Sequence, residues 1–202
     1  MPAEPAMLDA DDFRLHAWVD ESMRAARDGA DGIYLMAAAV ADPTACDDVR
    51  DNLRAMTEKK AERLHWRHET PERQAKIAAV IGNHDIVNLV VVGMPLDARR
   101  QERARAICAE RLLYELDDLG VAHVWLETRH QALNQRDLRL VKALRGKRSI
   151  SSSIRVEFAR PKDEPMLWIP DAVAGAVNGA RSGAADVLDD MGRISIIDIA
   201  LP

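Results

Sequence analysis

The sequence predicts an α/β domain in which a mixed β-sheet opens with a β-hairpin and carries helices on both faces. Two strand-like segments come first, with a turn signal between them. Strand and helix patterns then alternate to the end of the chain. Several strand segments are short apolar runs, as expected for strands that are covered on both faces. Alternating β and α segments imply parallel strands that are linked by right-handed helical crossovers.

The opening hairpin is predicted from two different hydrophobic patterns. Phe13 to Val19 alternates apolar and polar side chains, the pattern of a half-buried strand. Gly32 to Ala41 is almost wholly apolar, the pattern of a buried strand. The residues 28–32, Asp-Gly-Ala-Asp-Gly, form a turn signal between them. We therefore expect the two strands to pair as a hairpin.

Helix and strand signals follow the hairpin in alternation. Thr44 is a candidate N-cap for the first helix, and Thr70-Pro71 is a helix start. Residues 64–66 fit either a short strand or the end of the preceding helix. The remaining elements are expected at helix 70–81, strand 86–93, helix 98–119, strand 121–126, helix 137–144, strand 154–158, helix 166–178 and strand 194–199.

The element order suggests one domain with two flanking segments. We expect an N-terminal tail over residues 1–12, a domain over 13–182, and a C-terminal extension over 183–202 that holds a candidate extra strand.

Charge and composition limit the classes of partner. The net charge is −5 and the isoelectric point is near 5.7, so the chain does not coat nucleic acid by bulk charge. A nucleic-acid partner would need a local basic patch or a metal ion. The chain has two cysteines, no signal peptide and no apolar run of membrane length, which predicts a cytoplasmic protein with no membrane partner. A homo-oligomer remains open.

Two predicted strands end in the same pattern, His-x-Trp-x-acid, and the acids are Asp20 and Glu127. Alternate residues of a strand share a face, so each acid projects with the histidine and tryptophan before it. If the strands are parallel neighbours, the two acids meet at the carboxyl ends, where open α/β sheets form their sites. The alternative is a coincidence between two buried strands.

A third acid, Asp171, follows Pro170 in the first turn of a predicted helix. The small residues of 172–176 would let this helix lie close to the sheet and bring Asp171 near the strand ends. The alternative is a carboxylate that only stabilises the helix N-terminus through the helix dipole.

These motifs resemble the family called domain of unknown function 3800 (DUF3800) over roughly residues 13–181. Members open with a strand ending Asp-Glu-Ser, as in Asp20-Glu21-Ser22, and close with a helix motif like that of residues 170–176. Glu127 stands where members usually have aspartate, and Met23 where glycine is common. The resemblance implies an RNase H-like fold and places a Lys- or His-bearing segment near His65.

Carboxylates gathered at one point repel one another unless a cation neutralises them, and oxygen ligands suit Mg²⁺ or Mn²⁺. We therefore expect Asp20, Glu127 and Asp171 to be metal ligands, with Glu21, His65 and Asp137 as weaker candidates. The predicted function is a metal-dependent nuclease or phosphoryl-transfer protein of RNase H-like type. The alternative is a non-catalytic RNase H-like binding or scaffold protein, linked to mobile-element or phage-defence systems.

One basic segment is a candidate phosphate-binding surface, the loop that contains Lys142, Arg145, Lys147 and Arg148. The alternative is a solvated run of charges, which the sequence favours. The arginine series Arg99, Arg100, Arg103 and Arg105 is expected to be the solvent face of its helix.

Overall fold

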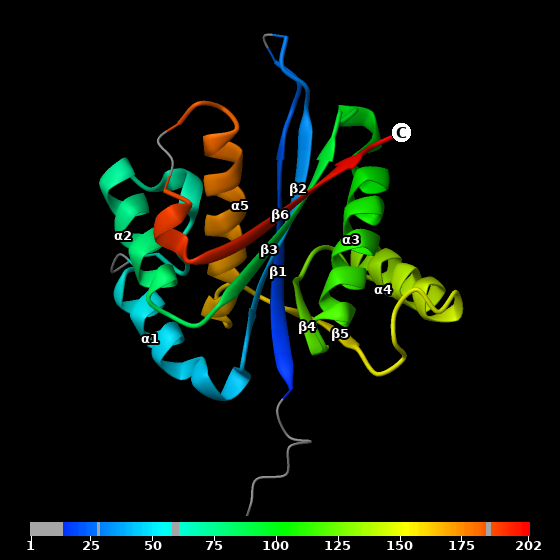
Figure 1. The fold of residues 1–202 in the computed structure, drawn as a ribbon, viewed down its shortest axis with the longest axis horizontal. Coiled ribbons are helices and arrows are strands. Elements are labelled where there is room, and N and C mark those ends of the chain that lie inside the picture. Colours follow the sequence, from blue (N-terminus) through cyan, green and yellow to red (C-terminus); the bar gives the residue numbers. More distant parts are fainter. Residues whose placement is uncertain (1–13, 28, 58–60, 185–186) are drawn as a thin grey trace, which may run out of the picture.

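The computed structural model describes residues 14–27, 29–57, 61–184 and 187–202. Within them the chain forms a six-stranded mixed sheet of order β5-β4-β1-β2-β3-β6, with helices on both faces (Figure 1). The strands are β1 (Leu15–Arg24), β2 (Ile33–Ala41), β3 (Val87–Met94), β4 (Val121–Glu127), β5 (Arg155–Ala159) and β6 (Arg193–Ala200). The helices are α1 (Asp47–Ala55), α2 (Pro71–Gly82), α3 (Gln101–Asp118), α4 (Gln131–Gly146) and α5 (Trp168–Ala180). The expected tail 1–12, and Phe13, lie outside the described residues.

The predicted hairpin forms the centre of the sheet. β1 and β2 pair antiparallel, with Asp20 opposite Ala37 and Arg24 opposite Ile33. Every residue of β2 is buried, because helices cover both of its faces. The central residues of β2, Ala37–Ala39, have small side chains, so helices can pack closely against both faces of the strand.

β1 and β4 are parallel neighbours, which confirms the prediction made from their shared pattern. Trp18 lies opposite Trp125, and Val19 lies opposite Leu126. The pairing with β4 ends there, while β1 continues to Arg24 against β2. Asp20 is therefore inside a strand, just beyond the point where its parallel neighbour stops, and not at the strand end that the sequence suggested.

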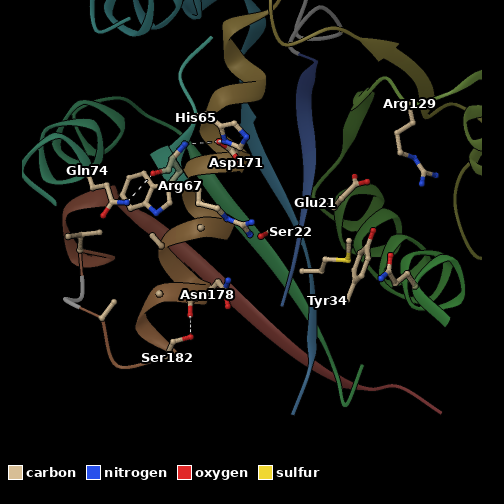
Figure 2. A pocket seen from close by; sticks show the side chains of 18 of the residues that line it. Glu21, Ser22, Tyr34, His65, Arg67, Gln74, Arg129, Asp171, Asn178 and Ser182 are labelled. Atoms are coloured by element: carbon tan, nitrogen blue, oxygen red, sulfur yellow. Dashed lines mark hydrogen bonds and ion pairs between the residues drawn. The ribbon is translucent and has the colours of Figure 1, made fainter. Parts of the chain in front are cut away.

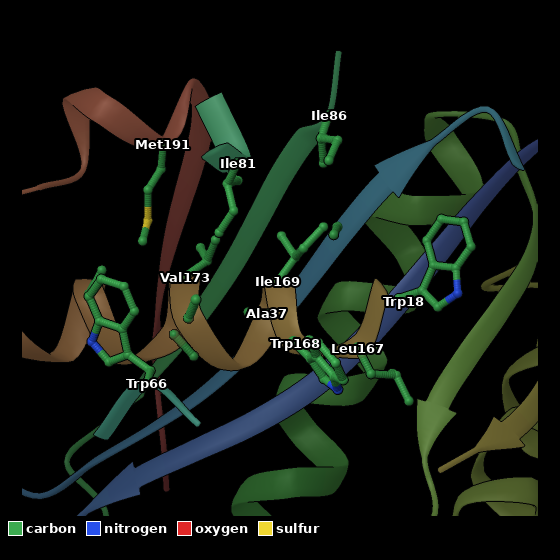
Figure 3. Packing of buried hydrophobic residues seen from close by; sticks show 14 of the residues in the cluster. Trp18, Ala37, Trp66, Ile81, Ile86, Leu167, Trp168, Ile169, Val173 and Met191 are labelled. Atoms are coloured by element: carbon green, nitrogen blue, oxygen red, sulfur yellow. The ribbon is translucent and has the colours of Figure 1, made fainter. Parts of the chain in front are cut away.

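Two apolar clusters form the core of the described residues, one on each face of the sheet. α1, α2 and α5 pack on one face around Trp18, Ile77 and Ile169 (Figure 3). α3 and α4 pack on the other face around Val19 and Leu112. The strict alternation of β1 sends Trp18 to one cluster and Val19 to the other. This burial on two sides is what the predicted α/β class requires.

α5 approaches its neighbours unusually closely at Gly175. A Cβ atom at this position would lie 2.2 Å from Cδ1 of Trp66, so only glycine fits without a shift. Trp66 is buried and opens a 3₁₀ turn, Trp66–His68. Residues 64–66 are thus neither a strand nor a helix end; they form a strap that Trp66 anchors against α5.

Two other boundaries differ from the sequence expectation or extend it. α4 begins at Gln131, six residues before the expected start, because its first turns are mostly polar, none of their side chains is buried, and their apolar signal is weak. The candidate strand at 194–199 exists as β6, which pairs parallel with β3. None of the described helices has the length and apolar content that crossing a membrane requires.

Candidate functional site

Asp20 and Glu127 lie on the face of the sheet that α5 covers. Both belong to the alternating series that contains Trp18 and Trp125, and both tryptophans pack with the α5-side cluster. The indole N–H of Trp125 donates to Nδ1 of His16 across the two strands, at 3.4 Å. The two strand patterns therefore interlock on one face, and their acids emerge at the same end.

Asp171 approaches the same end from α5. Its Oδ2 accepts the backbone N–H of Trp66 at 3.0 Å and lies 3.2 Å from Nδ1 of His65. The carboxylate is in the first turn of α5, where the helix dipole favours a negative charge. Asp171 thus both stabilises its helix and ties the Trp66 strap to it, which brings His65 to the site.

The carboxyl group of Asp20 is in an electrostatically unfavourable position. Burial raises the pKa of Asp20 well above its ordinary value, and the negative charges of Glu127, Asp171 and Glu21 raise it further. Oδ1 of Asp20 accepts a hydrogen bond from the backbone N–H of Glu21, at 2.7 Å. No cationic side chain pairs with Asp20 among the described residues. Asp20 is therefore surrounded by other negative charges, and the backbone N–H of Glu21 offsets only part of their repulsion.

Two arginines that the sequence analysis did not single out also line the site. Nη1 of Arg63 lies 3.1 Å from Oε1 of Glu127. Arg129, two residues after Glu127, lines the same cavity. The carboxylate cavity, as we call it, has a volume of about 210 Å³. Its walls are Asp20, Glu21, Glu127, Asp171, Arg63, His65 and Arg129.

Asp137 is placed differently from the other candidates. It is buried on the α3–α4 side of the sheet and does not line the carboxylate cavity. Its two oxygens accept from Arg105 at 3.2 and 3.0 Å and from Arg129 at 3.1 and 3.0 Å. Arg105 also pairs with Glu21. This buried network fixes Arg129 and Glu21 at the rim of the cavity, so Asp137 acts on the site through them.

A larger groove adjoins the carboxylate cavity (Figure 2). It has a volume of about 640 Å³ and runs between the carboxyl half of β1, α5 and the start of α3. Glu21, His65, Arg129 and Asp171 line both hollows, so the two are continuous. An extended ligand with a reacting group in the cavity could therefore lie along this groove.

The donor types of the cavity fit a hard divalent cation, since all four acids offer oxygen ligands. In the described ranges, however, no group of three or more His, Cys, Asp or Glu side chains is arranged to hold a metal ion. Glu127 is directed to Arg63, and Asp171 to the Trp66 strap. The acids are thus gathered in one place, but two of them are engaged with other partners in this conformation.

A search of family models and a search of curated proteins found no match to the chain. A solved structure does match: the RNase HII of the PCNA:RNase HII complex from Archaeoglobus fulgidus, at 13% identity and a TM-score of 0.50. The match covers 83% of this chain and 72% of the other. The fold is RNase H-like. At this identity the likeness concerns the RNase H-like fold alone, and the DUF3800 resemblance rests on its short motifs.

The sequence pointed to the acids that line the carboxylate cavity but not to Arg63 and Arg129. Arg63 comes from a loop with no regular pattern, and its approach to Glu127 depends on how Trp66 docks on α5. The one sequence signal for Arg129 is its position two residues after Glu127, just past the end of β4. Charged residues just past a strand end are too common for that signal to single it out.

Proposed function

We propose that this RNase H-like chain is a divalent-metal-dependent hydrolase of nucleic-acid phosphodiesters, as its resemblance to DUF3800 implies. The observation that carries the proposal is the state of Asp20. This carboxyl group is buried and surrounded by other acids, and no cationic partner of it is present among the described residues. A bound cation would offset both the desolvation and the repulsion.

In this proposal Asp20, Glu127 and Asp171 would hold Mg²⁺ or Mn²⁺. Such an ion, when bound, would supply Lewis acidity to a phosphoryl oxygen and would make a water molecule more acidic. The likeness of the fold to an RNase HII supports nucleic acid as the substrate class. The groove beside the cavity gives a polymer room on one side of the reacting phosphate.

The remaining cavity residues have roles that follow from their chemistry. Arg129 is held by Asp137 and Glu102, and it contributes positive charge at the rim of the cavity that would attract a phosphate. Arg63 pairs with Glu127 in this structure, and its guanidinium would be available to a phosphate if Glu127 held a cation instead. His65, oriented by Asp171, can hold or release a proton at the groove side of the cavity.

A second candidate is a non-catalytic RNase H-like binding or scaffold protein. The Arg63–Glu127 pair favours this second candidate, because the Arg63 guanidinium neutralises a carboxylate that a metal ion would otherwise neutralise. On this reading Asp20 is a remnant of an ancestral site, and no metal binds at concentrations of cellular relevance.

Cleavage of end-labelled DNA and RNA oligonucleotides in Mn²⁺ separates the two candidates. The hydrolase reading predicts cleavage by wild type, loss of cleavage in Asp20→Asn, and wild-type rates in Asp85→Asn, which removes an exposed acid remote from the cavity. Equal trace rates in wild type and Asp20→Asn, across all substrates, would leave the scaffold reading.

A further inference from the structure

We propose that a basic surface at the start of α3 binds the backbone of a nucleic-acid strand and delivers one of its phosphates to the carboxylate cavity. The surface consists of Arg99, Arg100 and Arg103 with Arg136 of α4; we call it the arginine surface. This inference rests on the proposed function, because it names how the substrate reaches that site.

The arginine surface is a shallow, open depression formed by the 3₁₀ turn Ala98–Arg100, α3 and α4. Its side chains line an open depression of about 560 Å³. Arg100 and Arg136 have side chains that are 58% and 59% exposed. Arg99 and Arg103 are exposed as well. Residues from the 3₁₀ turn Ala98–Arg100, from α3 and from α4 thus converge on one hollow, which a series of arginines along a single helix face would not form.

The guanidinium groups are only weakly neutralised by the protein. Arg100 lies 3.5 Å from Asp97, and Arg136 lies 3.8 Å from Glu102, both in exposed pairs. No ion pair to Arg99 or Arg103 occurs within the described residues. The whole chain carries a net charge of −5, so this positive surface is a local feature. Weakly paired arginines on an acidic protein are suited to bind a polyanion selectively at one place.

The arginine surface is connected to the proposed reaction site. Gln101 and Glu102 line both the depression and the groove. Arg129 and Glu21 line both the groove and the carboxylate cavity. Glu102 also accepts from Arg129 at 2.8 Å, which ties the two ends of the path together. A continuous series of hollows therefore leads from the arginines to Asp20.

A nucleic-acid strand fits this path better than a lipid membrane does. A strand presents phosphates at regular intervals and can follow a curved series of hollows. A membrane surface is flat, and an interfacial site would show large apolar side chains among its cations. The apolar member of the depression is Ala98, too small to enter a bilayer.

The test is equilibrium binding of a fluorescent single-stranded oligodeoxynucleotide to the full chain in EDTA, so that no cleavage occurs. The variant is Arg99→Gln/Arg103→Gln. For single strands the logarithm of the binding constant changes by about 0.7 per phosphate contact for each tenfold change in salt. Loss of two contacts should therefore weaken binding roughly 20-fold near 0.1 M salt and lower the salt slope by about 1.4.

The matched control is Lys142→Gln/Lys147→Gln, which removes the same charge from the exposed basic segment at the end of α4. Wild-type affinity in the control, with the predicted loss in the arginine variant, supports the inference. Equal losses in both variants, no binding by wild type, or binding of anionic phospholipid vesicles in place of the oligonucleotide would overturn it. Because the assay contains no metal, its failure leaves Mn²⁺ binding at Asp20 untouched, and the reverse also holds.

Discussion

Arg63 and Glu127 form an ion pair with 3.1 Å between Nη1 and Oε1, inside the cavity that Asp20 also lines. The pair joins the residue just before the Trp66 strap to the end of β4. It neutralises one of the gathered acids and leaves Asp20 without a cation of its own among the described residues. A metal ion bound to Glu127 would have to compete with Arg63, so the pair and the ion are alternatives at one carboxylate.

Arg63→Gln should therefore bind Mn²⁺ more tightly than wild type. The Arg63 side chain is 39% exposed, so the pair is worth at most about 1 kcal/mol, and the gain in affinity should be roughly two- to fivefold. Calorimetric titration of Mn²⁺ into wild type and the variant measures this affinity. Arg67→Gln, which changes an exposed arginine four residues along that lines the groove only, should leave the Mn²⁺ affinity unchanged. Weaker binding in Arg63→Gln would mean that Arg63 supports the site.

Asp20→Asn should be at least as stable as wild type at neutral pH in EDTA. The pKa of Asp20 is raised in the folded state, so the folded chain binds a proton more tightly than the unfolded chain does. In wild type, the protonated Asp20 carboxyl group makes its full contribution to stability below the unfolded pKa of about 3.9. This contribution is lost as pH rises through the folded pKa. Asparagine keeps the acceptor for the Glu21 amide and removes this loss.

Urea unfolding of wild type and Asp20→Asn at a series of pH values gives the comparison. The difference in stability should grow from near zero at about pH 4 towards neutral pH, in favour of the variant. If Asp20→Asn is much less stable than wild type at every pH, Asp20 is a satisfied structural residue and the cation proposal fails.

Asp137→Ala should cost about 3–5 kcal/mol of stability, because it leaves the buried guanidinium of Arg105 without two of its hydrogen bonds. Asp51→Ala breaks an exposed pair with Arg54 and should cost less than about 1 kcal/mol. Chemical denaturation of both variants checks the ratio. A cost below about 1 kcal/mol for Asp137→Ala would show that the buried network does not hold Arg129 and Glu21 in place.

Gly175→Ala should destabilise the chain by about 1–3 kcal/mol, since the new methyl group would overlap the Trp66 ring. Gly179→Ala, one turn later on α5, meets only Ala184 at 3.5 Å. It should be neutral or stabilise the chain by up to about 1 kcal/mol through helix propensity. Thermal melts of the two variants provide the measurement, and similar melting temperatures would contradict the close packing of the strap on α5.

The sequence predicted the framework of the site because the framework depends on local patterns. The shared pattern before Asp20 and Glu127 predicted that the two strands run parallel and that their matching residues share one face of the sheet. The register of β1 against β4 confirms both predictions. Hairpin, crossover helices and β6 follow from hydrophobic periodicity and turn residues. The position of Asp171 followed from small residues on α5.

What the sequence could not predict depends on contacts between distant segments. The Trp66 strap has no periodic pattern, and its course is set by the space at Gly175. The Arg63–Glu127 pair depends on that course. The arginine series at 99–103 reads as a solvated helix face until Arg136, on another helix, is seen to close the same depression.

We propose that Asp20 and its neighbouring acids form a divalent-cation site that Arg63 partly blocks. Calorimetric titration of Mn²⁺ into Arg63→Gln and into Arg63→Gln/Asp20→Asn tests this proposal, because the competing arginine is absent from both variants. We expect saturable binding to the first variant and its loss in the second. No binding to Arg63→Gln, or equal binding to both variants, would contradict it.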